Sequence, residues 1–453
     1  MAGSRRRRQL KRQQARDLPP AKRPTEVVRV NFVDRLSEDL LGNIRHRLGS
    51  LDRLSFGVVC KTAGHPMNLD TAATPWIVFP GASEEKVTFF PLADRRAATA
   101  RTSVLGMRGH VVLGSSFGWL ATADELGALQ IVDPVTGERA RLPDVSTFPF
   151  IRYSRSSSRV GHYYINTAAY LQFRYGGKPP PEGKEKDIMP RSNSHTGNQM
   201  RQWFYAKVVL AASPRPDNYA AMLILDKDFG VPAFATAQDR AWKVAPSRDG
   251  IEDAIHHDGR FYSVSHDGAV EAWERHGVTG EFTSKLVSVV SIMDVENFVL
   301  ERKYIVAMPD GRLVVVTKYT REEASTGYYD TKKWSCVFIV QVLDAKRGRW
   351  KNTTDIGDTA LFVGMNSSLC VSTKVHPGIK PGCVYFTDDE LHQAAEKRDR
   401  EAASGYHRHD TDKADHGPQH VGVYNLKDGT VEVLEGFGLQ PWSSPPVWFT
   451  PSV

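Results

Sequence analysis

The sequence predicts a mainly β protein with a small helical unit near its N-terminal end. From about residue 75 onward, short runs rich in β-branched and aromatic residues alternate with turn signals. Asp-Gly pairs, which supply the positive φ angles of tight hairpin turns, recur at 249–250, 258–259, 267–268, 310–311 and 428–429. A hairpin series of about 380 residues is too long for one ordinary sandwich, and a closed ring of sheets solves that problem. At roughly 40–50 residues for each four-stranded blade, we expect a β-propeller of about six to eight blades.

The composition is typical of a soluble globular chain. Hydrophobic residues make up 41% of the 453 residues and charged residues 25%, which allows a sizeable core. No apolar run approaches the ~18 residues needed to cross a bilayer, and no apolar segment follows the basic N-terminus as in a secretory signal. The four cysteines form no C-x-x-C pair, so we expect reduced thiols in a nuclear or cytoplasmic protein: Cys60, Cys336, Cys370 and Cys383.

Residues 1–30 form a basic arm that we expect to be disordered. They hold ten basic residues against two acidic ones, a charge of +8, whereas the whole chain carries +7, so the rest sums to −1. A neutral body argues against a specific nucleic-acid surface. The basic blocks look like a nuclear-import address, with a solvated arm that meets no receptor as the alternative. They comprise Arg5, Arg6, Arg7, Arg8, Lys11, Arg12, Lys22 and Arg23.

Residues 31–65 hold the clearest helical pattern. Its apolar stripe follows a 3.6-residue period through Leu36, Leu40, Leu41, Ile44 and Leu48. Ser37 is placed to cap this helix, with Glu38 and Asp39 in the first turn, where the helix dipole favours negative charge. Gly49 and Ser50 end it, and a second helix follows. A helical unit of this size cannot bury all its leucines, and we expect some of them to pack on a partner or on the next domain.

Residues 66–453 are predicted to form the propeller. Three polar stretches interrupt its strands, and we expect mobile loops near 176–200, 320–333 and 393–418. Most tryptophans should pack between blades. The terminal "PPVWFTPS" is a plausible last strand that closes the ring against the first blade near Trp76.

The pentad Gly114 to Gly118, "GSSFG", fits the G-x-S-x-G pattern of serine hydrolases. A nucleophile elbow needs a helix directly after its serine, but a short strand pattern follows Ser116. We therefore expect Ser116 to belong to a blade strand, beside glycines where backbones pass close together. The run "GDTALFVGMNSSL" lacks the lysine of a phosphate loop and the ligand pattern of a calcium loop. We expect no catalytic residue, no bound metal and no cofactor.

The helical segment "LSEDLLGNIRHRLGSLDRLSFGVVCK" resembles an F-box, whose usual pattern is Leu-Pro-x-Asp-Leu-Leu, an apolar stripe, Leu-x-x-x-Asp and Val-Cys-Lys. Two positions depart from it: Ser37 stands in place of the proline, and Thr62-Ala63 replaces the usual aromatic residue. The resemblance implies a set of residues that line an adaptor interface or the F-box core. These are Leu36, Leu40, Leu41, Ile44, Leu48, Leu51, Val59 and Cys60.

The remaining chain resembles the plant F-box proteins that carry a KIB-type β-propeller. The strongest piece is "DIGDTALFVGMNSSLCVSTKVHPGIKPGCVYFTDDEL", from Asp355 to Leu391. Supporting pieces include "PWIVFP", "FFPLADRR", "GSSFGWLATAD", "VDPVTGERARLP" and "DGRFYSVSHDGAVEAWE".

This resemblance implies a substrate-recognition subunit of a Skp–cullin–F-box ubiquitin ligase, a receptor that performs no bond chemistry itself. Its F-box would bind a Skp-type adaptor, and through it a cullin, while the propeller would bind the protein to be ubiquitinated. The location would be the nucleus, the cytoplasm or both, with no membrane partner. Two alternatives stay open: a propeller scaffold whose degenerate F-box binds no adaptor, and a propeller enzyme that uses Ser116.

Overall fold

The computed structural model describes residues 36–49, 52, 56, 74–80, 86–101, 107–155, 161–166, 168–171, 194–226, 230–247, 250–290, 298, 300–323, 333–376, 378–387, 389, 421–434 and 445–451. The chain divides into two compact units, one of residues 1–48 and 55–67 and one of residues 49–54 and 68–453. The first unit contains helix α2 (Glu38–His46). The second contains seven β-sheets within the described residues.

Four of these sheets are simple antiparallel meanders of consecutive strands. The first holds β4 (Val111–Ser116), β5 (Trp119–Ala123), β6 (Leu129–Val132) and β7 (Arg139–Arg141). The next holds β11 (Tyr205–Leu210), β12 (Ala220–Leu225), β13 (Pro232–Thr236) and β14 (Lys243–Val244). The third holds β15 (Ile251–His257), β16 (Arg260–Ser265), β17 (Ala269–Arg275) and β18 (Phe282–Val289). The fourth holds β19 (Leu300–Ala307), β20 (Leu313–Glu323), β21 (Lys333–Asp344) and β22 (Arg349–Thr353).

Another four-stranded sheet joins the two ends of the propeller sequence. It has the order β28-β1-β2-β3, with β1 (Trp76–Pro80), β2 (Lys86–Pro91), β3 (Ala98–Arg101) and β28 (Val447–Phe449). Strand β28 pairs with β1 in antiparallel register, Trp76 opposite Phe449 and Ile77 opposite Trp448. The expectation that the C-terminal strand closes the ring beside Trp76 is therefore confirmed.

The two remaining sheets depart from the four-stranded pattern. A five-stranded sheet has the order β24-β23-β25-β26-β27, and its β23–β25 pair is parallel. Its strands are β23 (Thr359–Val363), β24 (Leu369–Ser372), β25 (Cys383–Thr387), β26 (Val421–Asn425) and β27 (Val431–Val433). A three-stranded sheet has the order β10-β9-β8, with β8 (Ile151–Arg155), β9 (Gly161–Ile165) and β10 (Ser194–Thr196). The short helices η2 (Val145–Thr147) and α6 (Gly197–Trp203) flank this last sheet in the sequence.

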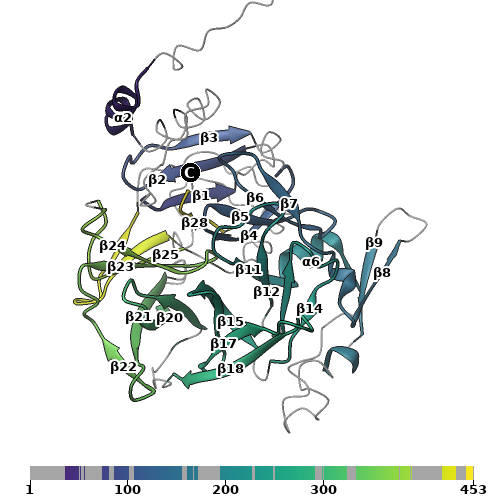
Figure 1. The fold of residues 1–453 in the computed structure, drawn as a ribbon. Coiled ribbons are helices and arrows are strands. Elements are labelled where there is room, and N and C mark those ends of the chain that lie inside the picture. Colours follow the sequence, from purple (N-terminus) through teal and green to yellow (C-terminus); the bar gives the residue numbers. More distant parts are fainter. Residues whose placement is uncertain are drawn as a thin grey trace, which may run out of the picture. The chain divides into compact units, whose positions relative to one another are not determined.

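Six of the sheets form a ring of blades (Figure 1). Their innermost strands contact one another in the succession β28, β4, β11, β15, β19 and β24, and one apolar cluster joins the last blade back to the closing blade through Phe362 and Trp448. Six blades lie within the predicted range. The sheet β10-β9-β8 is an insertion between the blade that starts with β4 and the blade that starts with β11.

The Asp-Gly turns form as predicted at four of the five positions. Gly259, Gly268, Gly311 and Gly429 have φ angles of 75°, 82°, 82° and 70°, and each lies between two paired strands. The pair at 249–250 differs, because Gly250 directly precedes β15 and thus lies between two blades.

The expected loops are regular in part. Residues 194–203, which overlap the end of the loop expected at 176–200, form β10 and α6, because Thr196 caps the helix in a capping box with Gln199. Residues 320–323 and 333 belong to β20 and β21. The remainder of these loops, including all of 393–418, lies outside the described residues.

The packing of aromatic residues follows the prediction. Trp76, Trp119, Trp242, Trp273 and Trp448 are at most 3% exposed, Trp350 is half-buried against an apolar cluster, and Trp442 lies outside the described residues. Within those residues Cys336, Cys370 and Cys383 are free thiols, and no helix is long and apolar enough to span a membrane.

Candidate functional site

Helix α2 presents an apolar face to solvent. The Ser37 hydroxyl accepts a hydrogen bond from the Leu40 amide at 3.4 Å, so this serine caps the helix as predicted. Leu40 and Ile44, one helical turn apart, are 51% and 38% exposed, whereas Leu41 is 2% exposed. The helix therefore combines a buried leucine with two aliphatic side chains that are free to contact another protein.

The other predicted adaptor-binding residues are only partly placed. Leu36 and Leu48 are half-buried at the two ends of α2. Leu51, Val59 and Cys60 lie outside the described residues, as does every arginine and lysine of the predicted import signal.

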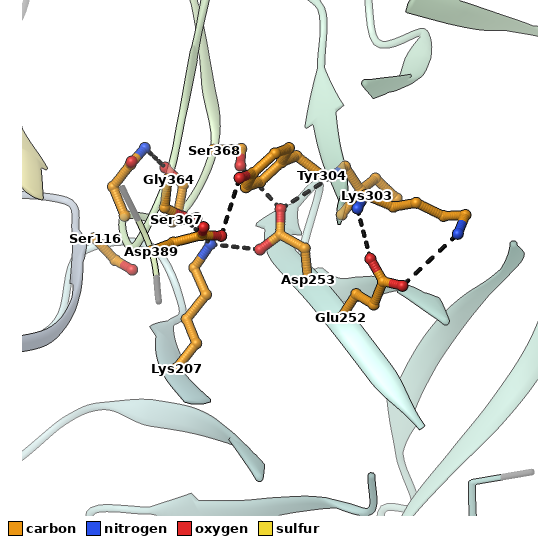
Figure 2. Close-up of polar contacts among 12 residues, drawn as sticks. Ser116, Lys207, Glu252, Asp253, Lys303, Tyr304, Gly364, Ser367, Ser368 and Asp389 are labelled. Carbon is orange, nitrogen blue, oxygen red and sulfur yellow. Dashed lines mark hydrogen bonds and ion pairs between the residues drawn. The ribbon is translucent and has the colours of Figure 1, made fainter. Parts of the chain in front are cut away.

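A buried polar cluster lies where the inner strands of the blades meet. The Lys207 ammonium on β11 donates to the Asp253 carboxylate on β15 and, at 3.0 Å, to the Gly364 carbonyl after β23. The two charged side chains are 3% and 1% exposed. Figure 2 shows Lys207 reaching from its strand toward Asp253 and Gly364.

Asp253 has two further donors from other blades. Its Oδ2 atom accepts from the Ile305 amide on β19 at 3.0 Å. The same atom accepts from the Ser368 hydroxyl at 2.9 Å (Figure 2). The carboxylate is therefore surrounded by donors from three neighbouring elements, which is how a buried charge is made tolerable. This one side chain joins blades that are distant in sequence.

Ser116 takes part in the same central region, as the last residue of β4. It is 4% exposed, and its Oγ accepts a hydrogen bond from the Leu210 amide at 3.2 Å. The neighbouring Ser115 carbonyl accepts from the Ser367 amide at 2.7 Å. A Cβ atom at Gly114 would lie 2.4 Å from the Val208 carbonyl oxygen, so only glycine permits this approach. The prediction that Ser116 is a blade residue beside a close backbone contact is confirmed.

Two more buried carboxylates connect neighbouring blades. Asp389, which follows β25, accepts from Arg302 Nε and from the Tyr304 hydroxyl, both at 3.0 Å. Glu252 accepts from the Lys303 amide at 2.5 Å and lies 2.6 Å from His266 Nδ1. These contacts bridge β15 and β19 on one side and β19 and β25 on the other.

Burial and ion pairing shift the pKa values in this cluster. Burial lowers the pKa of Lys207 and raises that of Asp253, while their mutual attraction opposes both shifts. Burial also acts to raise the pKa of Asp389, but the charges of Arg302 and Lys318 outweigh it and bring that pKa below its ordinary value. The cationic neighbours of Asp389 thus favour its ionised form.

Chemically, the cluster acts as a set of cross-links. Its hydrogen bonds join side chains of one blade to side chains or backbone groups of another, and the Ser116 oxygen accepts from an amide of the next blade. A local sequence signal for this cluster exists: Lys207 lies within the strand "YAKVVL", and Glu252 and Asp253 lie within "IEDAI". Charged residues within buried strands usually have a partner in the fold.

The arrangement agrees with a known family. The model of the KIB1-4 β-propeller matches residues 89–425. The chain belongs to this family. The match covers the blades that carry Lys207, Asp253 and Asp389, and the structure adds β1 and β28, which complete the closing blade of the KIB1-4 propeller.

A comparison with solved structures found several chains of low similarity. The β-propeller domain of Cps50 (Swd1) from Myceliophteria thermophila is 11% identical, with 59% of this chain and 78% of that chain covered and a TM-score of 0.27. The dihydro-heme d1 dehydrogenase NirN is 11% identical over 63% of this chain and 54% of that chain, with a TM-score of 0.28. The computationally designed Ika8 protein is 12% identical over 59% and 71%, with a TM-score of 0.24. No curated protein matches the sequence.

Proposed function

We propose that this chain is the substrate-recognition subunit of a Skp–cullin–F-box ubiquitin ligase. Its propeller supports a protein-interaction role, because the fold of this family offers a rigid surface to which another protein can bind. The observation that carries the ligase part of the proposal is α2, whose exposed Leu40 and Ile44 fall in the segment that resembles an F-box. Exposed aliphatic pairs of this kind favour a protein partner.

In this proposal the two units bind different partners. The F-box-like segment binds the Skp-type adaptor, and the propeller binds the protein to be ubiquitinated. The receptor is non-catalytic. The buried position of Ser116 and its hydrogen bond from the Leu210 amide support that part, since a nucleophile needs access to its substrate.

Co-purification with a Skp-type adaptor tests the proposal. Leu40→Ala/Ile44→Ala removes apolar surface without opening the core, because both side chains are exposed. We expect it to abolish capture of the adaptor. Leu126→Ala/Val278→Ala is the matched control, as these propeller side chains are 66% and 92% exposed, and it should capture normally. Equal adaptor capture by wild type and Leu40→Ala/Ile44→Ala contradicts the proposal.

The second candidate function is a scaffold whose F-box-like segment binds no adaptor. The observation that favours it is Ser37 in place of the usual proline. Ser37→Pro separates the two, because it restores the residue that the F-box pattern has at this position. A scaffold would capture adaptor only after this change, whereas a working receptor captures it before and after.

We also propose that the basic arm directs the chain to the nucleus as well as the cytoplasm. The block Arg5 to Arg8 and the pairs at 11–12 and 22–23 support this. Replacing all eight residues by alanine should move a fluorescent fusion to the cytoplasm. Unchanged nuclear fluorescence of that variant would show that the arm does not direct nuclear import.

A further inference from the structure

The inserted sheet β10-β9-β8 has one strand fewer than the four-stranded blades beside it. One of its faces is buried on the ring, where Ile151, Tyr163 and Ile165 are 3–6% exposed within the largest apolar cluster. The hairpin of β8 and β9 lies at the periphery of the blades (Figure 1). Its fourth position, beside β8, is open in the described structure.

The backbone of β8 has unused hydrogen-bonding groups along this edge. The Phe150 carbonyl accepts from the Asn166 amide at 2.7 Å on the side of β9, and Arg152 and Ser154 follow the same alternation. Tyr153 and Arg155 therefore direct their N–H and C=O groups away from β9. Among the described residues, no backbone hydrogen bond uses these groups. An edge of this kind is a template for an added strand.

The side chains of this edge define the charge of a suitable partner. Four of the five residues of β8 are exposed, and Tyr153 and Tyr164 are 40% and 39% exposed. Strands β8, β9 and β10 contain Arg152 and Arg155 but no aspartate or glutamate. Neither arginine has an ion pair within the described residues, and Arg152 instead lies over the Tyr164 ring at 5.8 Å. Arginine and tyrosine are the residue types enriched at protein interfaces.

We propose that β8 binds an extended acidic segment of a partner protein as the fourth strand of this sheet. The backbone of that segment pairs with Tyr153 and Arg155, the addition of a strand to an open edge. Arg152 and Arg155 point to opposite faces of the sheet, so they select two carboxylates three residues apart. The chain's own residues 172–193 hold five basic against three acidic residues and are therefore not an acidic segment.

This inference deepens the proposed function by naming a substrate class, an acidic extended segment, and it requires the interaction role but not adaptor binding. The probe is a fluorescein-labelled eight-residue peptide of valine and threonine with glutamates three residues apart. Fluorescence anisotropy on the full chain should show binding that weakens with salt. Lysine in place of both glutamates should abolish it, and so should a proline placed between the glutamates, which keeps the charge but prevents strand pairing.

Variants of the protein locate the site. Arg152→Glu/Arg155→Glu should weaken binding at least tenfold, because attraction becomes repulsion at both positions. Tyr153→Pro should weaken it similarly, since proline is tolerated on an edge strand but removes the outward N–H. Arg139→Glu/Arg141→Glu on the edge strand β7 is the matched control and should bind as wild type does. Circular dichroism melting checks that each variant is folded.

Three results would overturn the inference: binding unchanged by Arg152→Glu/Arg155→Glu, equal binding of the lysine peptide, or tighter binding of a labelled DNA oligonucleotide that the same variant loses. The last result would assign the edge to nucleic acid. Adaptor capture by Arg152→Glu/Arg155→Glu should equal that of wild type, so a failure here is distinct from a failure of the ligase proposal.

Discussion

Two sheets of the propeller unit obtain their last strand in different ways. The closing sheet receives β28 from the C-terminal end of the chain, and Trp448 is 0% exposed between Phe362 and Tyr385. The inserted sheet receives no fourth strand from the described residues, and β8 leaves four residues exposed. A filled edge contributes to the stability of the ring, whereas an open edge is available to a partner. Removing residues from the two sheets should therefore change the stability of the protein by unequal amounts.

The largest expected effect comes from truncation at Pro445. Without β28, strand β1 loses its inner partner and the core loses Val447, Trp448 and Phe449, all 0% exposed. We expect the propeller to lose its cooperative thermal transition. Removing only residues 452–453 is the control. A Pro445 truncation that melts at the wild-type temperature would show that β28 does not close the ring.

Single aromatic substitutions sharpen the same comparison. Trp448→Ala should destabilise the protein by about 3–5 kcal/mol, the usual cost of emptying a buried tryptophan site. The Val363 carbonyl also loses the hydrogen bond that Trp448 Nε1 donates to it at 3.2 Å. Tyr153→Ala on the open edge should cost less than about 1 kcal/mol, because the ring is already 40% exposed. Urea denaturation measures the loss in free energy of unfolding of each variant. Similar losses would contradict the difference between the two sheets.

The buried ion pair of Lys207 and Asp253 is a second connection between blades whose removal should destabilise the ring. Lys207→Met leaves the buried Asp253 carboxylate without its cation, and such a loss costs about 3–5 kcal/mol. Lys207→Met/Asp253→Leu should be less destabilising than the sum of the two single changes. Additive costs in urea denaturation would show that the two side chains do not act as a pair.

Asp389 makes part of this stability dependent on pH. Its pKa lies below the ordinary value in the folded state, because Arg302 and Lys318 outweigh its burial. The contribution is therefore present above the unfolded pKa of about 4 and is lost as the pH falls through the lower folded pKa. Asp389→Asn should be less stable than wild type by about 1–3 kcal/mol at pH 7, and the gap should narrow below pH 4. A gap that is constant from pH 7 to pH 3 would contradict this.

Ser116→Ala should have only a small effect on stability. The Leu210 amide would lose its acceptor in a buried site, at a cost of about 1 kcal/mol. Binding of partners should remain intact, because Ser116 is only 4% exposed. Loss of adaptor or peptide binding in a folded Ser116→Ala variant would reopen the role of this serine. Labelling of wild-type Ser116 by a fluorophosphonate would do the same.

The local features of the fold were predictable because they depend on neighbouring residues. Asp258-Gly259 forms its turn with φ angles of 46° and 75°, as that dipeptide favours. Ser37 caps α2 through an amide three residues away. Trp76 and Trp448 were placed correctly because a propeller must close and large aromatic residues must be buried.

Other features were not predictable in this way. Residues 194–200 are mostly polar and fell within the predicted loop, yet residues 194–203 form β10 and α6, because the insertion packs Met200 and Phe204 into the apolar cluster. The capping box at Thr196 was the available local signal. The missing fourth strand beside β8 leaves no trace in composition, since an edge strand and a central strand can share the same residues.

The sequence by itself determined the strand and turn content, the ring closure by its last strand and the position of the apolar helix α2. The strands, the turns and the helix depend on periodicity and turn dipeptides, which act over short distances. The ring closure was predictable because a propeller must close and large aromatic residues must be buried. Only the tertiary structure decided that Lys207, Asp253, Ile305 and Ser368 meet in one cluster, and that the edge of β8 is open. Both depend on which distant strands lie side by side, and that is fixed by packing of the whole ring rather than by any one segment.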